Sequence, residues 1–237
     1  SHLVDAVFHL PAQDYHERNR GSFLDTHLAQ ETIRSCAITE QELDHNGCSL
    51  IKADSDLTVD RLDYVLRDLR AVNRIYYPEY SAILNQLVVQ DGVIQCKNIE
   101  TAFAVFEKFL TVNREVYFNP HSEVATVVMT TLLRMMLHRG LLKEEDFFAT
   151  DNVLIAKIIA SPFQHIFASI GPKMQFTSTV DESAPFLQRK LRYIDPRIEG
   201  LPGRLTNHSV EAKKMLDDYL SIPTKIHYKI PILEGEI

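Results

Sequence analysis

Residues 54–68 of this chain read DSDLTVDRLDYVLRD, and this stretch is the most informative part of the sequence. Apolar residues recur at helical spacing, which predicts an amphipathic helix with a stripe made of Val59, Leu62, Leu66 and Leu69. On that helix Asp60, Tyr64 and Asp68 fall on adjacent faces, so their polar groups can point into one cleft. A solvated helix of mixed charge is the alternative interpretation of such a pattern.

The pattern on both sides of this stretch is mostly helical. Asn98 is a predicted N-cap, Pro120 suits the first turn of a helix, and Gly140 suits a helix end. Thr39 and Glu42 form a T-x-x-E capping box that predicts one more short helix. The other helices are expected at 22–35, 98–117, 120–138, 143–149, 151–160, 162–169 and 207–220.

Three segments predict extended structure instead. In LVVQDGVIQC, at 87–96, apolar runs flank Asp91-Gly92, which is typical of a tight hairpin turn. The segment TKIHYKI, at 224–230, alternates like a strand, and KLRYIDP, at 190–196, is its predicted partner. We therefore expect a mainly α fold, with a helical domain at 1–170 and a smaller C-terminal α+β portion at 171–237.

Composition limits the function classes further. The net charge is −7 and the pI is about 5.8, which argues against general nucleic-acid binding because that depends on Lys and Arg. No run reaches the roughly 18 apolar residues that a membrane span needs, and no signal peptide is visible. Cys36, Cys48 and Cys96 are far apart and odd in number, which fits reduced thiols in a cytoplasmic protein.

The string VDRLDYVLRD closely resembles the signature of HD-domain phosphohydrolases, in particular the deoxynucleoside triphosphate triphosphohydrolase branch. The resemblance implies an HD-like helical core and makes Asp60 a metal ligand. It also implies that Arg61, Tyr64 and Asp68 line the nucleotide pocket. These residue types suit the task, because carboxylates bind hard cations and a guanidinium binds phosphate.

A second match lies at NREVYFNP, residues 113–120, where Arg114 and Tyr117 fit the family's phosphate-binding segment, whereas Asn119 and Pro120 do not. KLRYIDPRI also resembles the family's C-terminal portion. In this family a metal-activated water attacks the α-phosphorus of a dNTP and releases a deoxynucleoside and triphosphate. The family also often forms homo-oligomers, so we expect a dNTP substrate and self-association here.

The family's metal is held by a His, an adjacent His-Asp pair and a distant Asp, but this sequence contains no His-Asp dipeptide. The segment LVDAVFHLP, at 3–11, resembles the family's HD-x-x-H-x-P segment, with His9 near its end. The pair aligns with Val4-Asp5, one residue too far away, or with Asp5-Ala6 if no gap is allowed, and in either alignment its His is lost. The resemblance implies one divalent ion, either Mn, Fe, Mg, Ni or Zn, with Asp60 and Asp5 as ligands.

Three explanations for the lost pair stay open. The first is that segments of the natural protein with the His-Asp pair are missing from this sequence. The second is that other ligands, such as His9 or His16, replace the pair. The third is that the fold binds a nucleotide without a metal.

The segment DTHLAQE, at 25–31, resembles the family's T-H-E helix, which makes His27 a candidate general acid or phosphate contact. His9 is the second catalytic candidate. The usual Glu is Leu28 here, so a carboxylate that orients His27 must come from elsewhere. Two functions therefore compete: a metal-dependent phosphohydrolase acting on dNTPs, and a catalytically impaired nucleotide-binding or regulatory subunit.

Overall fold

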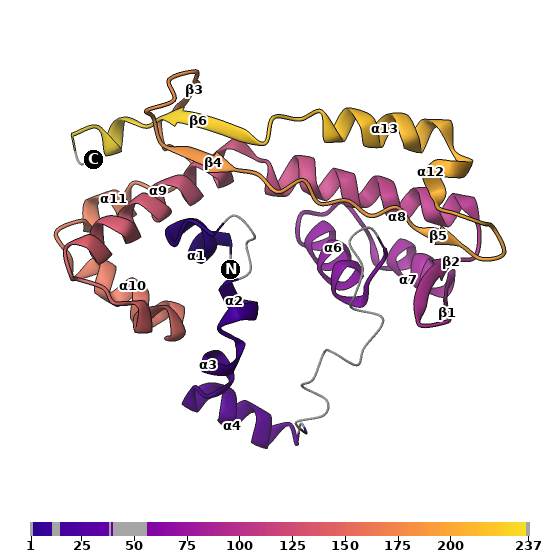
Figure 1. Cartoon of the computed structure of the whole chain (residues 1–237), viewed down its shortest axis with the longest axis horizontal. Helices are drawn as coiled ribbons and strands as arrows, with labels where there is room; N and C mark the ends of the chain where they lie inside the picture. Colours follow the sequence, from indigo (N-terminus) through magenta and orange to yellow (C-terminus); the bar gives the residue numbers. More distant parts are fainter. Residues whose placement is uncertain (1, 11–14, 38, 40–55, 236–237) are drawn as a thin grey trace. The chain divides into compact units, whose positions relative to one another are not determined.

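The structure is a computed structural model that describes residues 2–10, 15–37, 39 and 56–235. Helices dominate it and the sheets are small, which confirms a mainly α fold with a small C-terminal α+β portion (Figure 1). The chain divides into two compact units, each with its own hydrophobic core. Within the described residues, no helix is both long and apolar enough to cross a membrane.

Unit 2 comprises Glu40–Asn119 and Arg189–Thr224. Its described elements are α6 (Val59–Ala71), α7 (Tyr77–Asn85), β1 (Leu87–Gln90), β2 (Val93–Cys96), α8 (Ile99–Val112), the π-helical turn η3 (Asn113–Tyr117), β5 (Arg197–Ile198), α12 (Leu205–His208) and α13 (Val210–Leu220). Helix α8 contacts α6, α12 and α13, so the core of this unit surrounds α8.

The cap predicted for α8 is confirmed, whereas the apolar stripe predicted for α6 is wrong at Val59, which is exposed at the first position of the helix. The side chain of Asn98 accepts a hydrogen bond from the Thr101 amide at 2.8 Å, as an N-cap does. The buried face of α6 consists of Val65, Leu66 and Leu69, and that of α8 includes Phe106 and Phe109. Burial of these faces is what holds the two helices together.

The hairpin at Asp91-Gly92 is also confirmed. Strands β1 and β2 pair in antiparallel register with Gln90 opposite Val93, which leaves a two-residue turn. Both turn residues have positive φ, 52° at Asp91 and 71° at Gly92, as a type I′ turn requires. The short strand β5 adds to β2 in parallel and completes a three-stranded sheet.

Unit 1 comprises Ser1–Thr39, Pro120–Gln188 and Lys225–Ile237. Its described elements are α1 (His2–Val7), α2 (Tyr15–Arg18), α3 (Arg20–Leu24), α4 (His27–Ser35), α9 (Pro120–His138), the 3-10 turn η4 (Glu144–Phe148), α10 (Asp151–Ile159), α11 (Gln164–Ala168), β3 (Thr177–Thr179), β4 (Phe186–Gln188), β6 (Lys225–Lys229) and the 3-10 turn η5 (Pro231–Leu233). Helix α9 contacts α1, α11 and β4. Pro120 opens α9 and Gly140 follows its end, as predicted.

The tail strand is confirmed as β6, but its predicted partner is wrong. β6 lies between β3 and β4 and pairs antiparallel with both (Figure 1). Residues 190–196 belong to unit 2 and form no strand. There the carboxylate of Asp195 accepts hydrogen bonds from the amide and hydroxyl of Thr206, at 3.1 and 2.6 Å. These hydrogen bonds hold Asp195 against Thr206 and not against β6.

The single helix predicted at 22–35 is wrong in one respect, because the chain forms α3 and α4 with a break at Asp25 and Thr26. Thr26 is extended, and its hydroxyl accepts from the Ala29 amide at 3.3 Å, so it starts a new helix. The capping box at Thr39 and Glu42 lies outside the described residues. The boundary between the two units also does not lie at residue 170, because each unit consists of several separate segments. The predicted domains 1–170 and 171–237 stay a prediction.

Candidate functional site

Three predicted binding residues meet in unit 2. Helix α6 carries Tyr64 and Asp68 one turn apart, and η3 carries Tyr117. The Tyr117 hydroxyl donates a hydrogen bond to Oδ2 of Asp68, and the rings of Tyr64 and Tyr117 lie 6.5 Å apart between centroids. The structure therefore joins two segments that are distant in sequence into one polar and aromatic cluster.

The π-helical turn explains where Tyr117 points. At the end of α8, the buried Asn113 side chain donates to the Phe109 carbonyl at 2.8 Å, and the Asn113 carbonyl accepts from the Phe118 amide at 2.8 Å. The wider turn replaces the regular α ladder over Asn113–Tyr117. Such turns are rare and are frequent at functional sites.

Both phenols of the cluster are held in their protonated form. Burial, followed by the hydrogen bond to Asp68 and the charge of that carboxylate, raises the pKa of Tyr117. Burial also raises the pKa of Tyr64, although the charges of Arg61 and Arg192 act in the opposite direction. Each tyrosine therefore keeps an O–H group.

Arginines surround these aromatic rings. The charge of Arg192 acts on the Tyr64 phenol, and the Arg192 backbone carbonyl accepts a hydrogen bond from the Tyr219 hydroxyl at 2.9 Å. The guanidinium carbon of the predicted Arg114 lies 5.9 Å from the Tyr219 ring centroid. Such contacts orient guanidinium groups whose N–H edges stay available to anions.

The sequence analysis missed three members of this cluster: Arg189, Arg192 and Tyr219. The guanidinium carbon of Arg189 lies 4.9 Å from the Phe118 ring centroid, and Phe118 stacks on Tyr219 at 6.1 Å. A signal was present, since residues 189–192 read RKLR within an acidic chain. A basic run in such a chain is a candidate anion-binding segment.

The start of α6 places the predicted metal ligand Asp60 and its neighbour Arg61. Asp60 is exposed, and one carboxylate oxygen accepts from the Thr58 hydroxyl at 2.5 Å. Arg61 donates to the Asp56 carbonyl at 3.3 Å. The buried Asp56 carboxylate is ion-paired with Arg197 at 3.3 Å and Arg204 at 2.5 Å. This network fixes the chain just before the helix.

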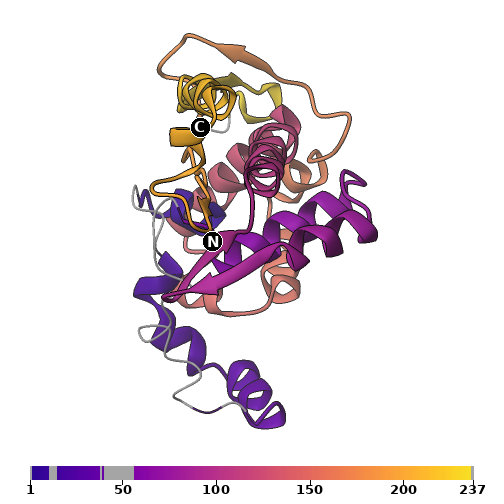
Figure 2. The same ribbon diagram turned by 90° about the vertical axis from the view of Figure 1, so that its right-hand side faces the viewer.

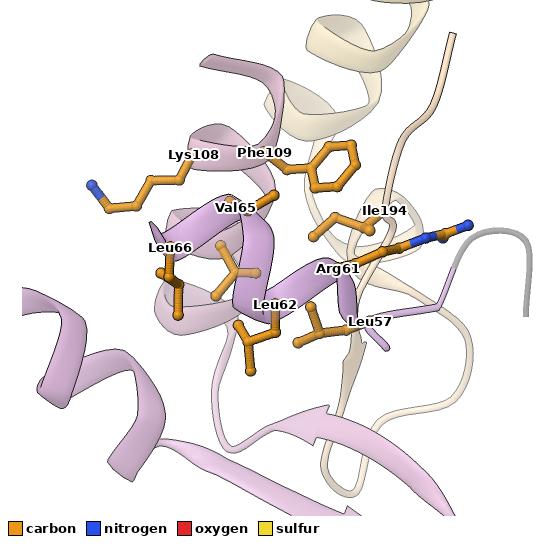
Figure 3. A pocket seen from close by; sticks show the side chains of 9 residues that line it. Leu57, Arg61, Leu62, Val65, Leu66, Lys108, Phe109 and Ile194 are labelled. Atoms are coloured by element: carbon orange, nitrogen blue, oxygen red, sulfur yellow. The ribbon is translucent and has the colours of Figure 1, made fainter. Parts of the chain in front are cut away.

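The small hollow beside α6 and α8 is apolar and is not part of this cluster. Its lining is aliphatic and aromatic apart from Arg61 and Lys108, whose charged ends point away from it (Figure 3). The Lys108 ammonium instead pairs with Glu79 at 2.6 Å. The hollow therefore offers nothing that would bind a phosphate group.

In unit 1 the structure places the predicted Asp5 and His9 at either end of one short segment. Asp5 is buried, its Oδ1 accepts from the Tyr15 amide at 2.8 Å, and its Oδ2 has no hydrogen-bond partner among the described residues. His9 is exposed, and its Nδ1 lies 2.9 Å from a guanidinium nitrogen of Arg134. Burial and the charge of Arg134 lower the pKa of His9.

His27 is the first residue of α4, the last of the three helices α2, α3 and α4, which follow one another along the chain (Figures 1 and 2). Its side chain is 96% exposed, and α4 buries no residue. The Glu31 carboxylate lies 3.9 Å from Nδ1 of His27, so the carboxylate near His27 comes from the next turn of its own helix. At this exposure the pair orients the ring only weakly.

The described residues do not fit the divalent metal that the resemblance implies. Within this part of the chain, no three His, Cys, Asp or Glu side chains lie close enough to hold a metal ion. Asp5 lies in unit 1 and Asp60 in unit 2, and the side chain of His16 is not described. One carboxylate rarely holds a transition metal against water, so neither Asp5 nor Asp60 alone makes a metal site.

Two known proteins are similar to this chain. Over 204 residues, 84% of its length, it is 26% identical to uncharacterized protein YdhJ of Bacillus subtilis. Over 128 residues, 51% of its length, it is 22% identical to metal-dependent phosphohydrolase cns2 of Cordyceps militaris. The matches cover 63% and 37% of these proteins, so the chain spans less than two thirds of each.

No family model matches the chain, and no solved structure matches it significantly. The chain is thus distantly similar to a metal-dependent phosphohydrolase, which agrees with an HD-type phosphohydrolase at the level of the superfamily. The deoxynucleoside triphosphate branch stays a prediction.

Proposed function

We propose that this chain is part of an HD-type phosphohydrolase that acts on deoxynucleoside triphosphates, and that unit 2 carries its substrate-binding side chains. The observation that carries the proposal is the joining of Tyr64, Asp68 and Tyr117 in one cluster beside Arg61 and Arg192. The similarity to a metal-dependent phosphohydrolase supports the reaction class.

Each side chain of the cluster is assigned a contact with one part of the nucleotide. Arg61, Arg114 and Arg192 supply N–H groups that bind phosphate oxygens, and a guanidinium does this with two bonds at once. The ring of Tyr64 offers an apolar face for the sugar. Asp68 accepts from a sugar hydroxyl while the Tyr117 hydroxyl stays bonded to the same carboxylate.

The proposed chemical step is the attack of water on the α-phosphorus, which breaks the bond between this phosphorus and the 5′ oxygen and releases deoxynucleoside and triphosphate. His27 and His9 of unit 1 are the proposed catalytic groups, as proton donors or as phosphate contacts. A divalent ion with Asp60 and Asp5 as ligands stays a prediction. Because the described residues supply no site with three ligands, we assign it no step.

Release of deoxynucleoside from each dNTP tests the proposal, with the full chain and added manganese. We expect turnover that falls about tenfold or more in Asp68→Asn, since this change removes a charge-assisted hydrogen-bond acceptor. Asp63→Asn is the matched control on the same helix, because Asp63 is exposed and its carboxylate pairs with Arg67 one turn away. Nucleotide binding without turnover would contradict the enzyme and favour a binding subunit.

A further inference from the structure

Helix α1 ends in a tight motif that places His9 in an unusual backbone conformation. The His9 amide donates to the Ala6 carbonyl at 3.2 Å, and the Leu10 amide donates to the Asp5 carbonyl at 2.8 Å. This is the Schellman pattern, in which the residue after the helix adopts a left-handed conformation. His9 has φ of 54°, in a position where glycine is the usual residue.

The side chain of Arg134, on α9, caps the C-terminal end of α1 by hydrogen bonding. Its Nε donates to the Val7 carbonyl at 3.1 Å, and a terminal nitrogen donates to the Ala6 carbonyl. These are carbonyls of the last turn of α1, which have no partner within the helix. The same terminal nitrogen lies 2.9 Å from Nδ1 of His9, so one guanidinium fixes both the helix end and the imidazole.

The contact between Arg134 and His9 determines which ring nitrogen of His9 carries the proton. A guanidinium has five N–H groups and no acceptor, so in this contact Nδ1 of His9 must accept. A neutral imidazole that accepts at Nδ1 carries its proton at Nε2. The lowered pKa of His9 agrees with a neutral ring. The exposed edge of His9 therefore presents an N–H donor.

We propose that Arg134 is a positioning residue that holds His9 as the Nε2–H tautomer, so that His9 donates a hydrogen bond to a phosphoryl oxygen and does not ligate a metal. The choice of a phosphoryl oxygen rests on the proposed function. A metal-bound histidine uses one nitrogen for the ion and donates from the other to a carboxylate or carbonyl. Here the second nitrogen faces a donor, which leaves no lone pair for an ion.

The test follows the His9 ring by ¹⁵N NMR in the full chain, with pyrophosphate or Zn²⁺ added. We expect a single tautomer protonated at Nε2, with Nδ1 accepting, and a saturable shift with pyrophosphate. Arg134→Met should give a mixture of tautomers, and Arg134→Lys should restore the Nδ1 contact in part. A ring protonated at Nδ1, a coordination shift with Zn²⁺ at His9, or no response to pyrophosphate would each overturn the proposal.

His9→Gly is the matched variant for binding, because glycine suits the left-handed position and preserves the end of α1. We expect it to fold with unchanged thermal stability or better, and to bind pyrophosphate about tenfold more weakly, as the loss of one hydrogen bond to a charged group predicts. Unchanged affinity in His9→Gly would contradict the donor role. If the chain hydrolyses no dNTP, the proposed function fails, while the tautomer and the pyrophosphate response still test this inference separately.

Discussion

The contact between Asp68 and Tyr117, which are 49 positions apart, shows which part of the candidate site could be predicted from the sequence. Helical spacing alone put Tyr64 and Asp68 on neighbouring faces of one helix, and the structure confirms that helix. Spacing carries no information about where the end of another helix comes to lie, so only the resemblance linked Tyr117 to them. Arg192 was missed because it lies in a segment without regular structure, where no periodicity marks a site.

Arg192→Gln tests the newly identified member of the cluster. The change removes a cation whose charge acts on the Tyr64 phenol. We expect the KM for dNTPs to rise about tenfold or more while kcat changes little, because a lost phosphate contact weakens substrate binding. Lys190→Gln is the control, since it removes a neighbouring positive charge from the same run. Equal effects of both substitutions on KM would contradict a specific role of Arg192.

The thiols give a second prediction at this scale. Burial raises the pKa of the Cys96 thiol to about 12, whereas Cys36 is exposed. Because the thiolate is the reactive form, Cys96 stays unreactive under mildly alkaline conditions in the folded chain. In a Cys36→Ser, Cys48→Ser variant we expect labelling by a disulfide reagent only after denaturant is added. Rapid labelling of that variant without denaturant would contradict the buried position of Cys96.

At the scale of elements, the helices with a clear start signal were predicted well, as Asn98 at α8 and Pro120 at α9 show. The helix α6 was predicted too, but its first stripe residue, Val59, is exposed. The hairpin was predicted because Asp91-Gly92 is a strong local signal. The pairing of β6 was not, because a strand's partner depends on tertiary contacts and not on its own alternation.

The ion pairs before α6 stabilise that element. Asp56→Asn leaves Arg197 and Arg204 without the carboxylate that both contact. We expect the free energy of unfolding to fall by about 2 kcal/mol, less than for a fully buried pair because the arginines are partly exposed. Urea denaturation measures this loss. Asp63→Asn on the same helix should change it by less than about 0.5 kcal/mol, and similar losses in both variants would contradict the account.

At the scale of the whole molecule, two units are each built from segments that are separated in sequence. The sequence carries no signal for such an arrangement, since local composition does not record which distant segments pack together. The net charge of the chain is likewise uninformative about which charged side chains lie close together. The net charge of −7 argued against general nucleic-acid binding, yet Arg114, Arg189 and Arg192 contact one aromatic cluster of unit 2. Net charge therefore does not describe how basic side chains gather at one place on the protein.

The most direct test of the nucleotide site is a calorimetric titration of the full chain with each of the four dNTPs. We predict saturable binding of at least one dNTP and about tenfold weaker binding in Tyr117→Phe, which loses the hydroxyl bonded to Asp68. Tyr77→Phe, an exposed tyrosine on α7, should bind like the unmodified chain. Absence of binding by the unmodified chain, or equal affinity in Tyr117→Phe, would contradict the assignment of the site to unit 2.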